Sequence, residues 1–163
     1  MAITAVFAML LVIVRACIQT ITIDEAASYL AFVGRDQPFQ WYPAEANHIV
    51  NSVLMRLFTT IFGLSHVSVR APAILGAAIY IGVAWYVCEL LSDRVAIQWP
   101  VFVCVVYNPF VLDFMVAARG YGLALAFLLC SIAIPVGTPW AAPGESTTRS
   151  TDLRSIPASS PGP

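Results

Sequence analysis

Residues 71–91 read APAILGAAIYIGVAWYVCELL and carry no charged side chain before Glu89, near the end of the run. A helix needs about 20 apolar residues to cross about 30 Å of hydrocarbon, so this stretch is long enough to span a membrane. In lipid every backbone polar group must find a partner within the protein, which excludes an isolated strand here. Residues 71–91 therefore predict a transmembrane helix.

The composition of the whole chain favours the same class. Of 163 residues, 60% are hydrophobic and only 10% are charged, and the mean hydropathy is +0.82. A soluble domain carries about a quarter charged residues. The eight basic residues are all arginines and are balanced by nine acidic ones, which leaves a net charge of −1 and no basic patch. This composition argues against a soluble globule and against a nucleic-acid-binding protein.

Three further segments predict membrane-spanning helices, at residues 2–23, 95–112 and 114–134. The first contains Arg15, whose side chain we expect to reach toward the membrane surface rather than to face a neighbouring helix. In the segment 95–112, Pro100 and Pro109 predict kinks or ends. The predicted fold is therefore an all-α, polytopic membrane protein with about four transmembrane helices in a membrane domain over residues 1–134.

The connections differ in character. Residues 24–70 form a long polar stretch after the first span, with a short helix expected from Asp24 onward and an amphipathic interfacial helix over residues 44–62, ended by Gly63. Residues 135–163 are rich in Pro, Gly, Ser and Thr and show no apolar periodicity. Such a segment cannot bury enough apolar surface to offset its chain entropy, so we expect a disordered tail.

Four spans place residues 24–70 and the turn expected around Asp113 on one side of the membrane. The polar side chains gathered there are Asp24, Glu25, Glu45, Asn47, His48, Asn51, Asp113 and Arg119. A carboxylate can act as general base on an alcohol, and a guanidinium can bind phosphate through two hydrogen bonds. The set suits transfer to a hydroxyl group, although ordinary solvation is the alternative for each residue alone.

A metal site is a weaker hypothesis. Glu45 and His48 lie one helical turn apart and could supply two ligands of a divalent ion, but two ligands do not complete a site.

Several short motifs occur in a characteristic order. They are DEA at residues 24–26, ANHIVN at 46–51, FGLS at 62–65, VRAP at 69–72, NPFVLDF at 108–114 and ARGYG at 118–122. In this order and spacing the chain resembles, over residues 1–134, the amino-terminal part of bacterial membrane glycosyltransferases of the GT-C superfamily. The similarity is to family 39 and Rgt-like enzymes, relatives of protein mannosyltransferases and lipid A aminoarabinose transferases.

This resemblance implies a sugar donor linked to polyprenyl phosphate and an acceptor on the outer side of the bacterial cytoplasmic membrane. It implies Asp24 as catalytic base with Glu25 beside it, and Asp113 as a second acid. Arg119 is implied to bind the donor phosphate, and Tyr121 of the same motif is implied to contact substrate. The polar patch implied to contact substrate consists of Asn47, His48 and Asn51. The resemblance also implies a cytoplasmic amino terminus, with Asp24 outside.

The chain departs from this family in two respects. Ile49 follows His48 where relatives usually have proline, and relatives have many more spans. We therefore expect a truncated or frameshifted product, inactive without the remainder of the enzyme as its partner. The alternative is a small non-enzymatic membrane protein that packs against partners. A small transporter is a third hypothesis, disfavoured because Arg15 lies deep in its span with no acid expected beside it.

Overall fold

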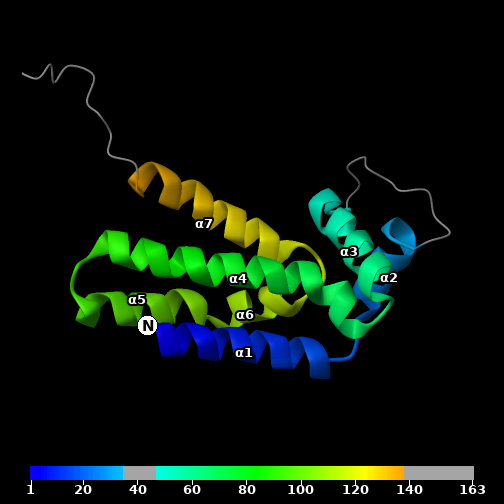
Figure 1. Cartoon of the computed structure of the whole chain (residues 1–163), viewed down its shortest axis with the longest axis horizontal. Helices are drawn as coiled ribbons and strands as arrows, with labels where there is room; N and C mark the ends of the chain where they lie inside the picture. The colour runs from blue at the N-terminus through cyan, green and yellow to red at the C-terminus, as the bar shows by residue number, and fades with distance from the viewer. Residues whose placement is uncertain (35–46, 138–163) are drawn as a thin grey trace, which may run out of the picture.

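The computed structural model describes residues 1–34 and 47–137, and within these ranges the chain forms seven helices and no strand (Figure 1). The helices are α1 (Ala2–Ile18), α2 (Ile23–Phe32), α3 (Ile49–Phe62), α4 (His66–Leu91), α5 (Val95–Val106), α6 (Pro109–Val116) and α7 (Tyr121–Gly137). The prediction of an all-α fold is confirmed for this part of the chain. Residues 135–137, the first three of the predicted disordered tail, belong to α7, so the tail prediction is wrong at its start. The rest of the predicted tail and the predicted ligand Glu45 lie outside the described residues.

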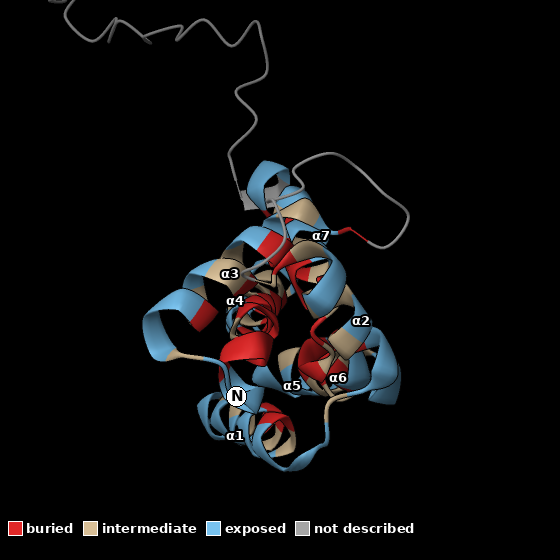
Figure 2. Cartoon of the chain, turned by 90° about the vertical axis from the view of Figure 1, so that its right-hand side faces the viewer, coloured by how far each residue is buried: buried red, intermediate tan, exposed pale blue. Residues whose placement is uncertain are grey.

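Helix α4 is the centre of the fold and packs against α1, α3, α5, α6 and α7. It begins at His66, five residues before the predicted start of the span. Ser65 and Ser68 explain this start, because each side chain accepts a hydrogen bond from the other residue's backbone amide, at 3.1 and 2.8 Å. Such a reciprocal cap satisfies amides that the first helical turn leaves without partners. Figure 2 shows buried residues concentrated along α4.

Small residues let α4 and α7 approach closely. A Cβ atom added at Gly76 would lie 2.7 Å from the Leu123 backbone nitrogen and 2.8 Å from the Gly122 carbonyl carbon. Ala73 and Ala77, on the same face of α4, are fully buried. Close backbone approach through small residues is typical of helix packing in membranes.

The first predicted span, residues 2–23, is wrong at its end. Helix α1 ends at Ile18, Gln19 is extended, and α2 begins at Ile23 with its axis turned by 79°. The Thr22 side chain accepts from the Glu25 amide at 3.3 Å, while the Glu25 carboxylate accepts from the Thr22 amide at 2.9 Å. This capping box starts a new helix where the apolar composition alone predicts continuation.

The predicted spans at 95–112 and 114–134 also have different boundaries. The chain breaks after α5, and α6 begins with Pro109 behind a cap in which the Asn108 side chain accepts from the Phe110 amide at 3.0 Å. The axes of α5 and α6 differ by 55°. Asp113 therefore lies within α6 and not in a turn, and the connection to α7 is formed by residues 117–120.

Two smaller predictions are confirmed. The helix expected from Asp24 is α2, and the amphipathic helix expected over residues 44–62 is α3, which begins at Ile49 and ends before Gly63. The glycine has a φ of 76°, a backbone conformation that residues with a side chain rarely adopt.

By length and composition, α4 is the one described helix that could cross a membrane alone, and up to three spans exist if each bent pair counts as one. The direction of the chain brings the end of α1, the start of α4 and the α6–α7 connection to one end of the bundle, where α2 and α3 also lie (Figure 1). Of the polar residues singled out by the sequence, Asp24, Asn47, His48, Asn51 and Arg119 lie at this end.

Candidate functional site

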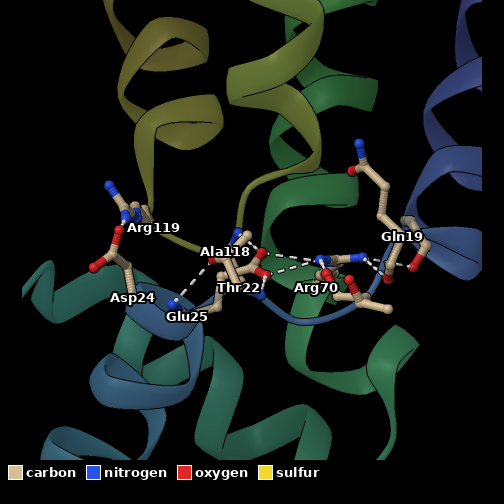
Figure 3. Close-up of polar contacts among 9 residues, drawn as sticks. Gln19, Thr22, Asp24, Glu25, Arg70, Ala118 and Arg119 are labelled. Carbon is tan, nitrogen blue, oxygen red and sulfur yellow. Dashed lines mark hydrogen bonds and ion pairs between the residues drawn. The ribbon is translucent and has the colours of Figure 1, made fainter.

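Asp24 and Arg119 form an ion pair at the polar end of the bundle (Figure 3). Their side chains are 68% and 34% exposed, so the pair is open to solvent. Both line a cavity of about 340 Å³. The remaining residues of its wall are Ala27, Ser28, Ala31, Phe32, His48 and Tyr121. The expectation that this acid and this arginine meet at one surface is confirmed.

One wall of the cavity is a face of α2. Ala27, Ser28 and Ala31 follow Asp24 by three, four and seven residues, so they lie on the same side of the helix. The two alanines leave the cavity open, and Ser28 adds a hydroxyl group that our sequence analysis missed. Its spacing of four residues from Asp24 is the signal that identifies it.

The opposite wall contains His48 and Tyr121. Their rings meet edge to face with centroids 5.3 Å apart, and the Tyr121 ring also contacts Phe114 at 5.1 Å. His48 precedes α3 and Tyr121 begins α7, so the ring contact joins two segments far apart in the sequence. The structure thus brings Asp24, His48, Arg119 and Tyr121 to one cavity.

Asn47 and Asn51 lie beside a second cavity, of about 290 Å³, which His48 also lines. Asn47 accepts a hydrogen bond from Ser52 at 2.9 Å. Asn51 donates to the Ala118 carbonyl at 3.2 Å, and its own side-chain oxygen is buried without a hydrogen-bond partner among the described residues. These two predicted substrate contacts are therefore separated from Asp24 by His48.

Glu25, next to Asp24, occupies a buried network with Arg70 and Ala118 (Figure 3). Its carboxylate accepts hydrogen bonds from Arg70 Nε at 3.1 Å and Arg70 Nη2 at 2.8 Å, and from the Ala118 amide at 2.8 Å. Both Glu25 and Arg70 are only 1% exposed. Glu25, predicted as a catalytic acid beside Asp24, has its oxygens fully engaged by protein donors and does not line the cavity that holds Asp24.

Arg70 also closes the end of α1. Its guanidinium donates to the carbonyls of Ala16, Gln19 and Thr20 at 3.1, 2.8 and 2.9 Å. The last carbonyls of a helix lack partners within the helix and attract cations, so Arg70 stabilises the break that follows α1. The sequence marks Arg70 only as part of a family-like motif and predicts no role for it.

The pKa of Glu25 is shifted by competing effects. Burial disfavours the charged carboxylate and raises the pKa, whereas the hydrogen bonds from Arg70, Ala118 and Thr22 and the positive charge of Arg70 lower it. The attractive contacts outweigh the burial, and the pKa lies below its ordinary value. Glu25 therefore stays ionised at neutral pH and serves as a fixed acceptor.

The structure does not bring Asp113 into the cavity. Its carboxylate pairs with Arg15 of α1 at 2.5 Å, and the two side chains are 61% and 30% exposed. This contact corrects two expectations: Arg15 faces a neighbouring helix, and an acid does accompany it. The pair bridges α1 and α6, and neither residue lines the Asp24 cavity.

Among residues 1–34 and 47–137, no three His, Cys, Asp or Glu side chains are grouped so that they could hold a metal ion. Comparison of the chain with protein families, curated proteins and solved structures finds no match. The chemistry of the site therefore rests on its own geometry. A carboxylate and a guanidinium that meet across an open cavity can accept a proton and bind an anion.

Proposed function

We propose that the chain is the amino-terminal part of an integral-membrane glycosyltransferase that transfers a sugar from a polyprenyl-phosphate donor to an acceptor hydroxyl on the outer side of a bacterial cytoplasmic membrane. The observation that supports it best is the cavity where Asp24 and Arg119 meet. The motifs shared with GT-C enzymes give this pair its chemical interpretation. Both residues stand at the positions where those motifs carry a base and a phosphate-binding arginine.

Membrane insertion is supported by the surface of the bundle. Apart from Thr4 and Arg15, helix α1 is apolar on every side, with Ala8, Val12 and Ala16 buried on one face. Its exposed hydrophobic residues are Ile3, Val6, Phe7, Leu10, Ile13, Val14 and Ile18. A helix that is hydrophobic on every side belongs in a large core or in lipid. With α1, α4 and the bent α5–α6 pair as spans, the bundle is a polytopic membrane domain whose polar end, including α2, lies outside the hydrocarbon and faces outward.

The proposed reaction divides the work between the two residues. The acceptor oxygen attacks the anomeric carbon as the bond from that carbon to the phosphate oxygen breaks, which inverts the configuration. Asp24 accepts the hydroxyl proton. The departing lipid phosphate keeps the bonding electrons, and Arg119 binds its negative charge through paired N–H donors.

The ion pair has a consequence for this chemistry. Asp24 and the donor phosphate are both anions that bind the same guanidinium. A phosphate bound to Arg119 therefore competes with Asp24 and releases its carboxylate, which then accepts the proton of the acceptor. His48 and Tyr121 line the same cavity and supply polar atoms for the sugar or the phosphate.

Binding of undecaprenyl phosphate to the purified full chain tests the proposal. Native mass spectrometry counts bound lipid molecules, and undecaprenol, which lacks the phosphate, measures binding by the isoprenoid tail alone. We expect the chain to bind undecaprenyl phosphate more tightly than undecaprenol. This preference should be lost in Arg119→Gln and retained in Arg94→Gln. Arg94 is a matched control because it is exposed and precedes α5, at the far end of α4. Equal binding of the two lipids by the wild-type chain would contradict the proposal. An equal loss of undecaprenyl phosphate binding in both variants would also contradict it.

A further inference from the structure

We propose that Glu25 and Arg70 are positioning residues whose buried ion pair fixes the separation between Asp24 and Arg119. The significance of that separation rests on the proposed function, because it sets the space available to a phosphate and an acceptor. The geometric inference itself stands on the contacts of the described residues.

The first step is adjacency in the sequence. Glu25 follows Asp24, and Ala118 precedes Arg119. The hydrogen bond from the Ala118 amide to Glu25 Oε1, at 2.8 Å, therefore joins the side chain that follows Asp24 to the backbone that precedes Arg119. Successive helical residues point about 100° apart, so Asp24 faces the cavity while Glu25 faces the interior. One hydrogen bond thus connects the α2 side of the site, which carries Asp24, to the α6–α7 connection, which carries Arg119.

The second step is that Arg70 leaves Glu25 no freedom to move. A guanidinium has five N–H donors in a fixed plane. In Arg70 two of them go to Glu25, and the other three go to the carbonyls at the end of α1. Lysine has three donors and no planar fork, so it cannot replace this arrangement.

The α6–α7 connection is also held from α3. Asn51 donates to the Ala118 carbonyl, so both the amide and the carbonyl of residue 118 are engaged, by different helices. Gly120 has a φ of 80°, and a Cβ atom there would lie 2.9 Å from the Cβ of His48. Arg119 therefore lies between Ala118 and Gly120, which are both held in place by neighbouring residues. Glu25 holds Ala118 from α2, the helix that carries Asp24.

The test replaces both residues of the Asp24–Arg119 ion pair with cysteine and measures the distance between these two positions. In a full chain whose native cysteines are replaced, Asp24→Cys and Arg119→Cys are joined by bifunctional thiol reagents of graded length. We expect a sharp optimum of reagent length in this parent. Adding Glu25→Gln or Arg70→Lys is expected to broaden the optimum and lower the yield severalfold. Glu89→Gln is the matched control, because Glu89 accepts a hydrogen bond from Trp85 near the end of α4 and is remote from the site.

Circular dichroism separates positioning from folding. A purely stabilising role predicts that Glu25→Gln and Arg70→Lys chains with parental helix content keep the sharp optimum, and that result would overturn the proposal. If neither variant folds, amide hydrogen exchange in the wild-type chain decides. Strong protection of the Ala118 amide supports the anchor, and exchange at the rate of a free linker amide rejects it. No lipid enters these measurements, so they remain decisive even if undecaprenyl phosphate does not bind.

Discussion

Glu25 accepts a hydrogen bond from the Ala118 backbone amide at 2.8 Å, although 93 residues separate them in the chain. This contact links α2 to the connection between α6 and α7. Asp24 precedes Glu25, and Arg119 follows Ala118. The buried hydrogen bond between Glu25 and Ala118 is therefore the inner layer of a junction whose outer layer is the exposed ion pair between Asp24 and Arg119. The inner layer determines structure, and the outer layer is available for chemistry.

Removing one partner of the buried pair should destabilise the fold strongly. Glu25→Gln leaves Arg70 as a buried charge without its counter-ion, a change that costs about 3–5 kcal/mol in proteins. Asp113→Asn breaks the exposed pair with Arg15, for which about 0.2–1 kcal/mol is typical. Unfolding of both variants in mixed detergent micelles measures the difference. Equal free energies of unfolding would contradict the structural role given to Glu25.

Acid should weaken the same junction. The pKa of Glu25 is lowered in the folded chain, whereas a glutamate in an unfolded chain has a pKa of about 4.3. The carboxylate therefore contributes its full stability above that pH and loses it as the pH falls through the depressed folded value. The difference in unfolding midpoint between wild type and Glu25→Gln should shrink as the pH falls from 7 to 3. A difference independent of pH would show that the charge of Glu25 is not responsible.

Substitution of Gly76 tests the packing of α4 on α7. In Gly76→Ala the new methyl group meets backbone atoms at 2.7 and 2.8 Å, which cannot move independently, so we expect a loss of about 1–3 kcal/mol. Gly82 is in the same helix, and a Cβ there meets nothing within 4 Å. Gly82→Ala should be neutral or stabilising by up to about 1 kcal/mol. The free energy of unfolding of each variant is the measurement, and similar losses at both positions would contradict the close approach.

Gly120 and Gly63 offer a second matched pair. Both have positive φ, at 80° and 76°, so alanine should strain the backbone at either position by about 1–3 kcal/mol. Only at Gly120 does the added methyl group also meet His48 and Asn51. Gly120→Ala should therefore reduce binding of undecaprenyl phosphate by displacing His48, whereas Gly63→Ala should leave that binding unchanged. If Gly120→Ala and Gly63→Ala changed undecaprenyl phosphate binding equally, His48 would not be part of the phosphate site.

The sequence is most informative where one physical effect dominates. Residues 71–91 are so uniformly apolar that a helix follows, and Asp24 meets Arg119 because consecutive helices reverse direction. The helix breaks at Gln19 and Asn108 depend on caps of one or two hydrogen bonds, which composition does not reveal. Once α6 begins at Pro109, Asp113 is directed to Arg15 and not to the cavity.

Arg70 shows a different limit of sequence reasoning. A single arginine before an apolar run resembles an ordinary residue at a membrane surface, and nothing local distinguishes it. Its five hydrogen bonds go to four residues in α2 and around the end of α1, between 45 and 54 residues earlier in the chain. Only the assembled fold identifies it as the residue that closes one helix and orients another.

The affinity of undecaprenyl phosphate for Asp24→Asn, relative to the wild-type chain and Arg119→Gln, tests the central claim most directly. If lipid phosphate and Asp24 compete for Arg119, removing the carboxylate charge should tighten binding. An exposed ion pair worth about 0.2–1 kcal/mol corresponds to at most about a fivefold gain. Arg119→Gln should weaken binding in the same assay. Weaker or unchanged binding in Asp24→Asn, or unchanged binding in Arg119→Gln, would contradict a shared phosphate site.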